Sequence, residues 1–248
     1  MRKVLLVTGG SRGIGAATCT LAAQHGWAVA VNYTANSLAA DEVVRSIRNA
    51  GGQAMAVQAD VATEAQVLRM FEQIDAKLGP VHGLVNNAGV VDVTARVEDM
   101  SVARWKRMFD INVIGSFICA REAVRRMSTK HGGLGGSIVN VSSAAARLGA
   151  PGQYVDYAAA KGAIDAFTIG LAKEVGADGI RVNAVRPGLI ETDIHASGGL
   201  PNRVRDLQHQ VPMGRGGSAL EVAELIVWLL SDAASYTTMS LIDVSGGR

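Results

Sequence analysis

The chain has 248 residues, of which 48% are hydrophobic and 19% are charged. This composition excludes a disordered or collagen-like chain and is sufficient for the core of one large α/β domain. The chain has 24 Lys and Arg residues and 22 Asp and Glu residues, which leaves a formal net charge of +2. This small excess of positive charge does not indicate a nucleic-acid-binding protein.

The N-terminal sequence MRKVLLVTGG has too few consecutive apolar residues for the core of a signal peptide. The longest uninterrupted apolar run, LIVWLL at 225–230, is far shorter than a membrane span. We therefore expect a cytoplasmic protein with no membrane partner. Because the five histidines are dispersed and Cys19 and Cys119 lie far apart in apolar helical patterns, we expect buried reduced thiols and no metal site.

Short β-rich runs alternate with helical patterns along the whole chain. The expected strands are residues 3–7, 28–32, 54–58, 83–87, 137–141, 181–185 and 240–244. The helical patterns include residues 14–25, 37–49, 64–78 and 102–127. This alternation predicts a parallel sheet with right-handed crossovers and helices on both faces. No linker divides the chain, so we predict one Rossmann-type, doubly wound α/β domain over residues 1–248, with about seven strands.

A glycine-rich turn, TGGSRGIG, follows the first expected strand and opens the first helix. Gly9, Gly13 and Gly15 permit a tight turn and let backbone amides approach a pyrophosphate at the positive end of the helix. The spacing is neither G-x-G-x-x-G nor that of a P-loop. A close-packed corner would have the same composition, but the position at the first βα turn favours a dinucleotide site.

The second expected strand ends in VNYTANS, which lacks the acid that commonly holds the ribose hydroxyls of NAD. The first carboxylate after it is Asp41, inside the next helix. Without that carboxylate a 2'-phosphate is not repelled, and Arg12 places a cation in the glycine loop. We therefore favour NADP(H) over NAD(H) as the cofactor; the alternative is that Arg12 is only a solvated loop charge.

The stretch VDYAAAKGA places Tyr157 and Lys161 four residues apart in an expected helix. Residues i and i+4 lie on one helix face, so the phenol and the ammonium point to the same side. An ammonium in that position lowers the pKa of the phenol and makes it usable as an acid or base, although a plain surface pair has the same spacing. Tyr154 is a rival phenol, but residue 158 is alanine, so no lysine follows it at that interval.

Further motifs follow the glycine loop in order. They are DV at 60–61, NNAG at 86–89, Asn112 in FDINVIGSF, IVNVSS at 138–143, and YAAAK. With these motifs the chain resembles the short-chain dehydrogenase/reductase family over its whole length, from VTGGSRGIG to DVSGGR. The resemblance implies an oxidoreductase that transfers hydride between a nicotinamide and a small-molecule carbonyl or secondary alcohol, and the residues after the second strand favour NADP(H) for that role.

The resemblance also implies a catalytic tetrad of Asn112, Ser143, Tyr157 and Lys161. In that scheme the phenol is the acid/base, the serine hydroxyl binds the alkoxide, the lysine supports the phenol, and the asparagine anchors a water of the proton relay. Ser143 is preferred to Ser142 because it lies six residues before Gly149, as in relatives. Ser142 is then expected to be a hydrogen-bonding residue at the strand end.

The glycine loop and the resemblance together imply a set of cofactor-binding residues. They are Gly9, Ser11, Arg12, Gly13, Ile14, Gly15, Asn32, Tyr33, Thr34, Asp60, Val61, Asn87, Ala88, Gly89, Tyr157, Lys161, Pro187, Gly188, Ile190 and Thr192. The family places the DV pair at the adenine and the segment after Pro187 at the nicotinamide. The asparagines of NNAG could equally serve backbone amides and carbonyls alone.

Residues 190–215 are expected to form a mobile lid that selects the substrate. The segment 142–167 looks closest to relatives named glucose 1-dehydrogenase or 3-oxoacyl-carrier-protein reductase. A catalytically idle dinucleotide sensor or scaffold on the same fold is the alternative function. Epimerases and dehydratases of the longer relatives usually carry a larger C-terminal domain than this chain has. A homotetramer is implied by the family, although the apolar helix 219–230 could equally belong to a monomer's core.

Overall fold

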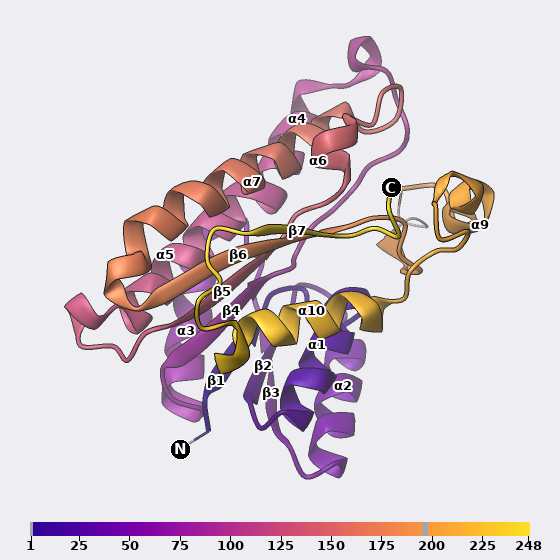
Figure 1. Ribbon diagram of the computed structural model, residues 1–248. Coiled ribbons are helices and arrows are strands. Elements are labelled where there is room, and N and C mark those ends of the chain that lie inside the picture. Colours follow the sequence, from indigo (N-terminus) through magenta and orange to yellow (C-terminus); the bar gives the residue numbers. More distant parts are fainter. Residues whose placement is uncertain (1, 195–197) are drawn as a thin grey trace.

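The computed structural model describes residues 2–194 and 198–248. Seven parallel strands form one sheet in the order β3-β2-β1-β4-β5-β6-β7 (Figure 1). The strands are β1 (Val4–Val7), β2 (Ala28–Tyr33), β3 (Gln53–Gln58), β4 (Val81–Asn86), β5 (Gly136–Val141), β6 (Ile180–Pro187) and β7 (Leu241–Val244). Each expected strand overlaps one of these, so the predicted doubly wound α/β architecture is confirmed.

Helices cover both faces of the sheet (Figure 1). They are α1 (Gly13–Gln24), α2 (Ser37–Asn49), α3 (Glu64–Lys77), α4 (Val102–Phe109), α5 (Gly115–Met127), α6 (Ala145–Leu148), α7 (Val155–Val175), α9 (Arg203–Leu207) and α10 (Ala219–Leu230). Helices α1, α2 and α10 pack on one face, and α3, α5 and α7 pack on the other. Within the described residues, no helix combines the length and the apolar character that crossing a membrane requires.

Each face of the sheet has its own hydrophobic core. Strand β1 contributes Val4 and Leu6 to one core and Leu5 and Val7 to the other. This alternation follows from the two-residue period of a strand, and burial on both faces explains why β1 is apolar throughout. Both cysteines are buried and neither forms a disulfide, as expected.

The expected helix 102–127 is interrupted. A π-helical turn, Asp110–Ile114, separates α4 from α5, and Asn112 lies in its middle. The Asn112 Nδ2 donates hydrogen bonds to the carbonyl oxygens of Met108 and Val90, each at 3.0 Å. A single π turn inside an α-helix is frequent at functional sites, and here it presents the asparagine to the segment that follows β4.

The strand order reverses at β1, because β2 lies on one side of it and β4 on the other. Ligands of doubly wound sheets bind beyond the carboxyl ends of the strands near such a reversal. The glycine loop follows β1, NNAG begins at the end of β4, and Ser142 and Ser143 follow β5. The topology therefore brings motifs from distant parts of the sequence to one edge of the sheet.

Candidate functional site

A cavity of about 1120 Å³ lies at this edge of the sheet. Most of the predicted site residues line it: Gly9, Ser11, Arg12, Gly13, Ile14, Tyr33, Thr34, Asp60, Val61, Asn87, Ala88, Gly89, Ser143, Tyr157, Lys161, Pro187, Gly188, Ile190 and Thr192. Three predicted residues, Gly15, Asn32 and Asn112, do not line it. The glycine loop and the Tyr-Lys pair thus border the same space.

Asn32 shapes the glycine loop from beneath. The backbone N–H of Gly9 donates to Asn32 Oδ1 at 3.2 Å, and Asn32 Nδ2 donates to the carbonyl oxygens of Val57 and Ala59. The side chain is buried and its hydrogen-bonding groups are occupied by backbone. The expectation that Asn32 contacts the cofactor is therefore corrected: it joins β1, β2 and β3 below the site.

Gly15 lies in α1, where it packs against the turn that follows β4. A Cβ at this position would lie 2.6 Å from Asn87 Nδ2 and would also collide with the carbonyl oxygen of Gly9. Asn87 cannot move away freely, because its Nδ2 donates to the backbone oxygens of Thr8 and Gly9 at 2.8 and 3.0 Å. Only glycine allows this close approach of helix and loop, so the residue acts through packing.

We expect Gly15→Ala to lower the free energy of unfolding by roughly 1–3 kcal/mol, because the added methyl group overpacks a rigid contact. It should also weaken dinucleotide binding, since the glycine loop must shift. Chemical denaturation and titration with NADPH measure the two effects. Gly170→Ala in α7 is the matched control: it meets open space and should stabilise the protein by roughly 0.5–1 kcal/mol. Equal stability of the two variants would contradict the packing argument.

The two asparagines of NNAG have different positions. Asn86 is buried, and its Nδ2 donates to Asn140 Oδ1 at 2.9 Å. Asn140 in turn donates to Thr168 Oγ1 on α7 at 2.9 Å. This chain of buried hydrogen bonds links β4 and β5 to the helix that carries Tyr157. Asn86 is structural, whereas Asn87 both bonds the glycine loop and lines the cavity.

The two serines after β5 make different hydrogen bonds. Ser142 is buried, and its hydroxyl donates to the carbonyl oxygen of Lys161 at 3.2 Å. Ser143 lines the cavity, accepts a hydrogen bond from the N–H of Ala145 at 3.1 Å, and forms a side-chain hydrogen bond with Tyr157. Ser142 lines the same cavity, so the choice of Ser143 as the catalytic serine stays a prediction.

Tyr157 and Lys161 are held close together on α7. The Lys161 Nζ lies 5.5 Å from the centroid of the Tyr157 ring and donates to the carbonyl oxygen of Val141 at 2.7 Å. Burial raises the pKa of the Tyr157 phenol to about 12, and the hydrogen bond from Ser143 opposes that shift. At neutral pH the phenol therefore carries its proton and can donate it.

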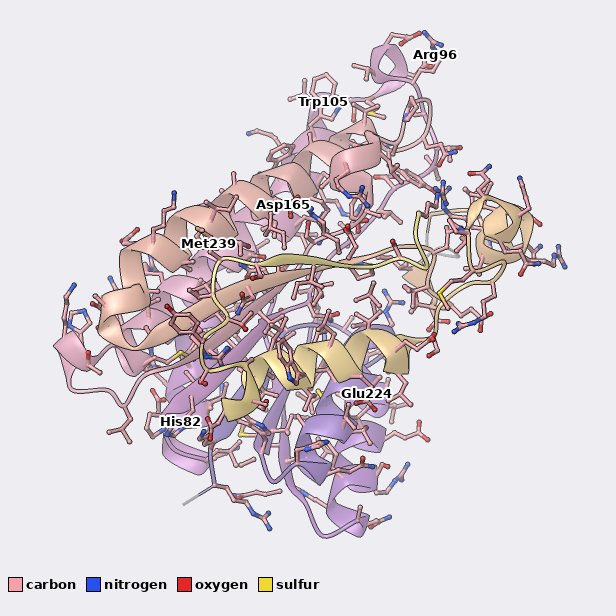
Figure 2. All side chains as sticks on the ribbon, viewed as in Figure 1. His82, Arg96, Trp105, Asp165, Glu224 and Met239 are labelled. Atoms are coloured by element: carbon pink, nitrogen blue, oxygen red, sulfur yellow. The ribbon has the colours of Figure 1, made fainter. Side chains whose placement is uncertain are left out.

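The Lys161 ammonium is buried as well. Burial lowers its pKa to about 8, and the negative charge of Asp165 opposes that shift. Asp165 lies one helical turn further along α7 and forms an ion pair with Arg186 at 2.8 Å (Figure 2). Since the pKa stays above neutrality, the side chain is mainly cationic at pH 7 and becomes neutral as the pH rises through about 8.

Asn112 meets the site at Gly89. A Cβ on Gly89 would lie 2.7 Å from Asn112 Oδ1 and 3.6 Å from Lys161 Nζ, so the asparagine and the lysine approach each other across this residue. Asn112 Oδ1 also accepts a hydrogen bond from the N–H of Val90 at 3.2 Å. The side chain is thus occupied by backbone groups and fixes the turn after NNAG.

Some residues of the site were missed by sequence reasoning. Arg203 and Arg248 also line the cavity, together with Tyr154, which the sequence suggests only as a rival acid/base. Arg104 forms a buried ion pair with Asp156, the residue before Tyr157. The position of Arg203 inside the expected lid was the only signal for any of them. Within the described ranges, no group of three or more His, Cys, Asp or Glu side chains is arranged to hold a metal ion.

Comparisons with known proteins agree with this geometry. A family model described as enoyl-(acyl carrier protein) reductase matches residues 9–248. The chain is 58% identical over 245 residues to the uncharacterized oxidoreductase YgfF of Escherichia coli, with 99% of each chain covered. It is 39% identical to a 3-oxoacyl-[acyl-carrier-protein] reductase of Synechocystis, over 99% of this chain and 96% of that one.

A solved structure of a mutant short-chain dehydrogenase/reductase from Serratia marcescens superposes with a TM-score of 0.91 at 33% sequence identity. The match covers 99% of this chain and 97% of that one. The family model, the two relatives and the solved structure each match nearly the whole chain. The protein therefore belongs to the short-chain dehydrogenase/reductase family and is an oxidoreductase.

Proposed function

We propose that the protein is an NADP(H)-dependent oxidoreductase that transfers hydride between the nicotinamide and a carbonyl or secondary alcohol of a small molecule. The observation that carries this proposal is the shared cavity: Ser143, Tyr157 and Lys161 line the same space as the glycine loop. Carbonyl reduction requires a proton donor and groups that stabilise the developing negative charge. The phenol, the hydroxyl and the ammonium of these three residues can supply them.

The cavity wall fits a dinucleotide with a 2'-phosphate. Arg12 is exposed at the N-cap of α1, and its side chain makes no hydrogen bond or ion pair with the described part of the chain. Tyr33, Thr34 and Asn36 line the neighbouring wall with neutral groups. The carboxylate of Asp60 is already engaged, because its Oδ1 accepts from the N–H of Ala62 at 3.0 Å. A phosphate would therefore meet a free cation and no acid at the end of β2.

Arg12→Ala should weaken NADPH binding by roughly tenfold or more, because a hydrogen bond to a charged group contributes about 1.5–3 kcal/mol. Binding of NADH should change much less, since NADH lacks the phosphate that Arg12 would contact. Calorimetric titration with both cofactors measures the difference. Arg69→Ala, at an exposed position on α3, is the control. An equal loss of affinity for NADPH and NADH would show that Arg12 does not recognise the phosphate.

The proposed mechanism follows from the protonation states. A bound NADPH would supply the hydride for the carbonyl carbon. Tyr157, protonated at neutral pH, donates its proton to the carbonyl oxygen, while Ser143 hydrogen-bonds the negative charge that develops there. The Lys161 ammonium stabilises the phenolate that remains and would also hold the nicotinamide ribose. Alcohol oxidation uses the same residues in reverse.

The proposal is tested with a panel of aldehydes, ketones and secondary alcohols, each supplied with NADP(H) and with NAD(H). The expected result is oxidation of NADPH by at least one carbonyl class, with slower turnover of NADH. Tight binding of NADPH without turnover across the panel would instead support the idle sensor or scaffold. The presence of all four proposed tetrad residues favours the enzyme: Asn112, Ser143, Tyr157 and Lys161.

We extend the proposal to a cytoplasmic homotetramer with a substrate lid over residues 190–215, of which residues 195–197 lie outside the described part of the chain. Helices α4 and α5 present large apolar side chains to solvent, among them Phe109, Phe117 and Trp105. Trp105 is labelled in Figure 2. Burial of such a group of side chains between subunits is the usual reason for their exposure on one chain. Light scattering should give four times the 25.8 kDa chain mass; a monomer would contradict this part of the proposal.

A further inference from the structure

At the lid end of the cavity, two buried polar atoms lack a partner. Tyr154 is only 5% exposed, and its hydroxyl has no hydrogen bond with the described residues. Arg203, on α9 of the proposed lid, has a buried Nη1 that is likewise without a partner among them. Both residues line the cavity. A buried N–H or hydroxyl that makes no hydrogen bond costs free energy, so these two atoms favour a ligand that satisfies them.

The Arg203 guanidinium is held in place by the segment that begins α7. Its Nη2 donates to Gln153 Oε1 at 2.6 Å, and its central carbon lies 5.1 Å from the centroid of the Tyr154 ring. These two contacts fix the plane of the guanidinium beside the phenol and leave Nη1 to a third partner. Tyr154 precedes the proposed acid/base Tyr157 by three residues, so one segment carries both ends of the proposed substrate site.

Positive charge is concentrated at this end. Arg248 lines the same cavity, and its pKa is lowered by burial and, next, by the charge of Arg203. Figure 1 shows α9 beside the C-terminus, in agreement with this proximity. Two acids, Asp60 and Asp193, also line the cavity, but neither forms an ion pair with these arginines in the described part of the chain. Arg203 and Arg248 thus bring two guanidinium groups to one cavity, and positive charge there attracts an anion.

We propose that the substrate carries a carboxylate in addition to its reacting carbonyl or alcohol, and that Arg203 and the Tyr154 hydroxyl bind that carboxylate. The inference rests on the proposed function, which places the reacting group at Tyr157. The planar guanidinium matches the two oxygens of a carboxylate, and the phenol donates to one of them. A neutral tail would leave the buried Nη1 unsatisfied.

The test compares straight-chain oxo acids with their methyl esters, which have the same reacting carbonyl and lack the negative charge. In the wild type, kcat/KM for the best acid should exceed that for its ester at least tenfold. In Arg203→Met this acid-to-ester ratio should fall to near one, and in Tyr154→Phe it should fall several-fold. Arg203→Lys keeps a cation and should therefore retain part of the acid-to-ester ratio. Partial retention would show that the loss in Arg203→Met comes from the missing charge and not from unfolding.

Arg205→Met is the matched control. Arg205 lies two residues along the same helix, its side chain is 71% exposed, and it pairs only with its neighbour Asp206 among the described residues. This variant should keep the wild-type ratio. Equal turnover of acid and ester by the wild type, or an unchanged ratio in Arg203→Met, would overturn the proposal. Preference for a phosphorylated ketone over every oxo acid would also overturn it, in favour of a phosphate site.

Binding separates this inference from the proposed function. Calorimetry with the Tyr157→Phe variant and NADP⁺ should show an oxo acid bound in an Arg203-dependent manner, without turnover. If the wild type binds oxo acids in this way but never reduces them with either cofactor, the proposed reaction fails and the carboxylate site stands. If carbonyls are reduced with no dependence on Arg203 or on a carboxylate, the reaction stands and the carboxylate site fails.

Discussion

Replacing Tyr157 by phenylalanine is expected to lower kcat by about 10²–10⁴-fold, the usual contribution of a general acid or base. The phenol lines the cavity beside Ser143, and its high pKa of about 12 keeps it protonated at neutral pH. Phenylalanine keeps the ring and removes the transferable proton. The expected loss is therefore in kcat, with NADPH affinity within a few-fold of the wild type.

Tyr236→Phe is the control for this experiment, because Tyr236 is fully exposed and lies outside the cavity. It should behave as the wild type in both turnover and cofactor binding. Steady-state kinetics on the best carbonyl of the panel and a cofactor titration give the two quantities. Near-normal turnover of Tyr157→Phe would show that another group is the acid, and Tyr154 would be the next candidate.

The second large effect is expected in stability, at the ion pair between Arg104 and Asp156. Arg104 Nε donates to Asp156 Oδ2 at 2.7 Å and Nη2 donates to Oδ1 at 3.1 Å, while the two side chains are 9% and 2% exposed. Arg104 also donates to the carbonyl oxygen of Val93 at 2.6 Å. Arg104→Met leaves a buried carboxylate without its cation, which should lower the free energy of unfolding by about 3–5 kcal/mol.

Urea denaturation measures this loss, and two further variants define its cause. Arg96→Met breaks a pair with Glu98 in which both side chains are exposed, at 74% and 60%, and should lower the free energy of unfolding far less (Figure 2). The double change Arg104→Met with Asp156→Leu removes both buried charges and should recover much of the stability. If Arg104→Met unfolds like the Arg96 variant, the pair contributes little and does not anchor the start of α7.

Much of the fold could be predicted because its signals are local. The strands are short β-rich runs between helical patterns, and glycine turns mark several of their ends. The interruption of 102–127 was missed because a π turn at Asn112 inserts one residue without changing the polar and apolar composition around it. The structure of the proposed lid is harder to predict, because residues 190–215 follow neither the helical nor the strand period over a useful length.

The proposed catalytic residues were found through motifs whose spacing is fixed by a strand end or a helix turn, as with Tyr157 and Lys161. The error at Asn32 has a physical reason: an asparagine at a strand end can bond the backbone beneath the loop as readily as a ligand above it. The contacts between Arg203 and Gln153, and between Arg104 and Asp156, join residues about fifty positions apart. The spacing of residues in the sequence does not predict contacts between such distant positions, so they are found only in the folded structure.

Transfer of deuterium tests the central claim most directly. The protein is supplied with NADPH deuterated at the transferring position of the nicotinamide and with the best carbonyl of the panel. The account predicts one alcohol formed for each NADPH oxidised, with deuterium on the carbon that bears the new hydroxyl, and loss of this product in Tyr157→Phe. Oxidation of NADPH without deuterium in an alcohol, or binding of NADPH with no oxidation by any carbonyl, would contradict it.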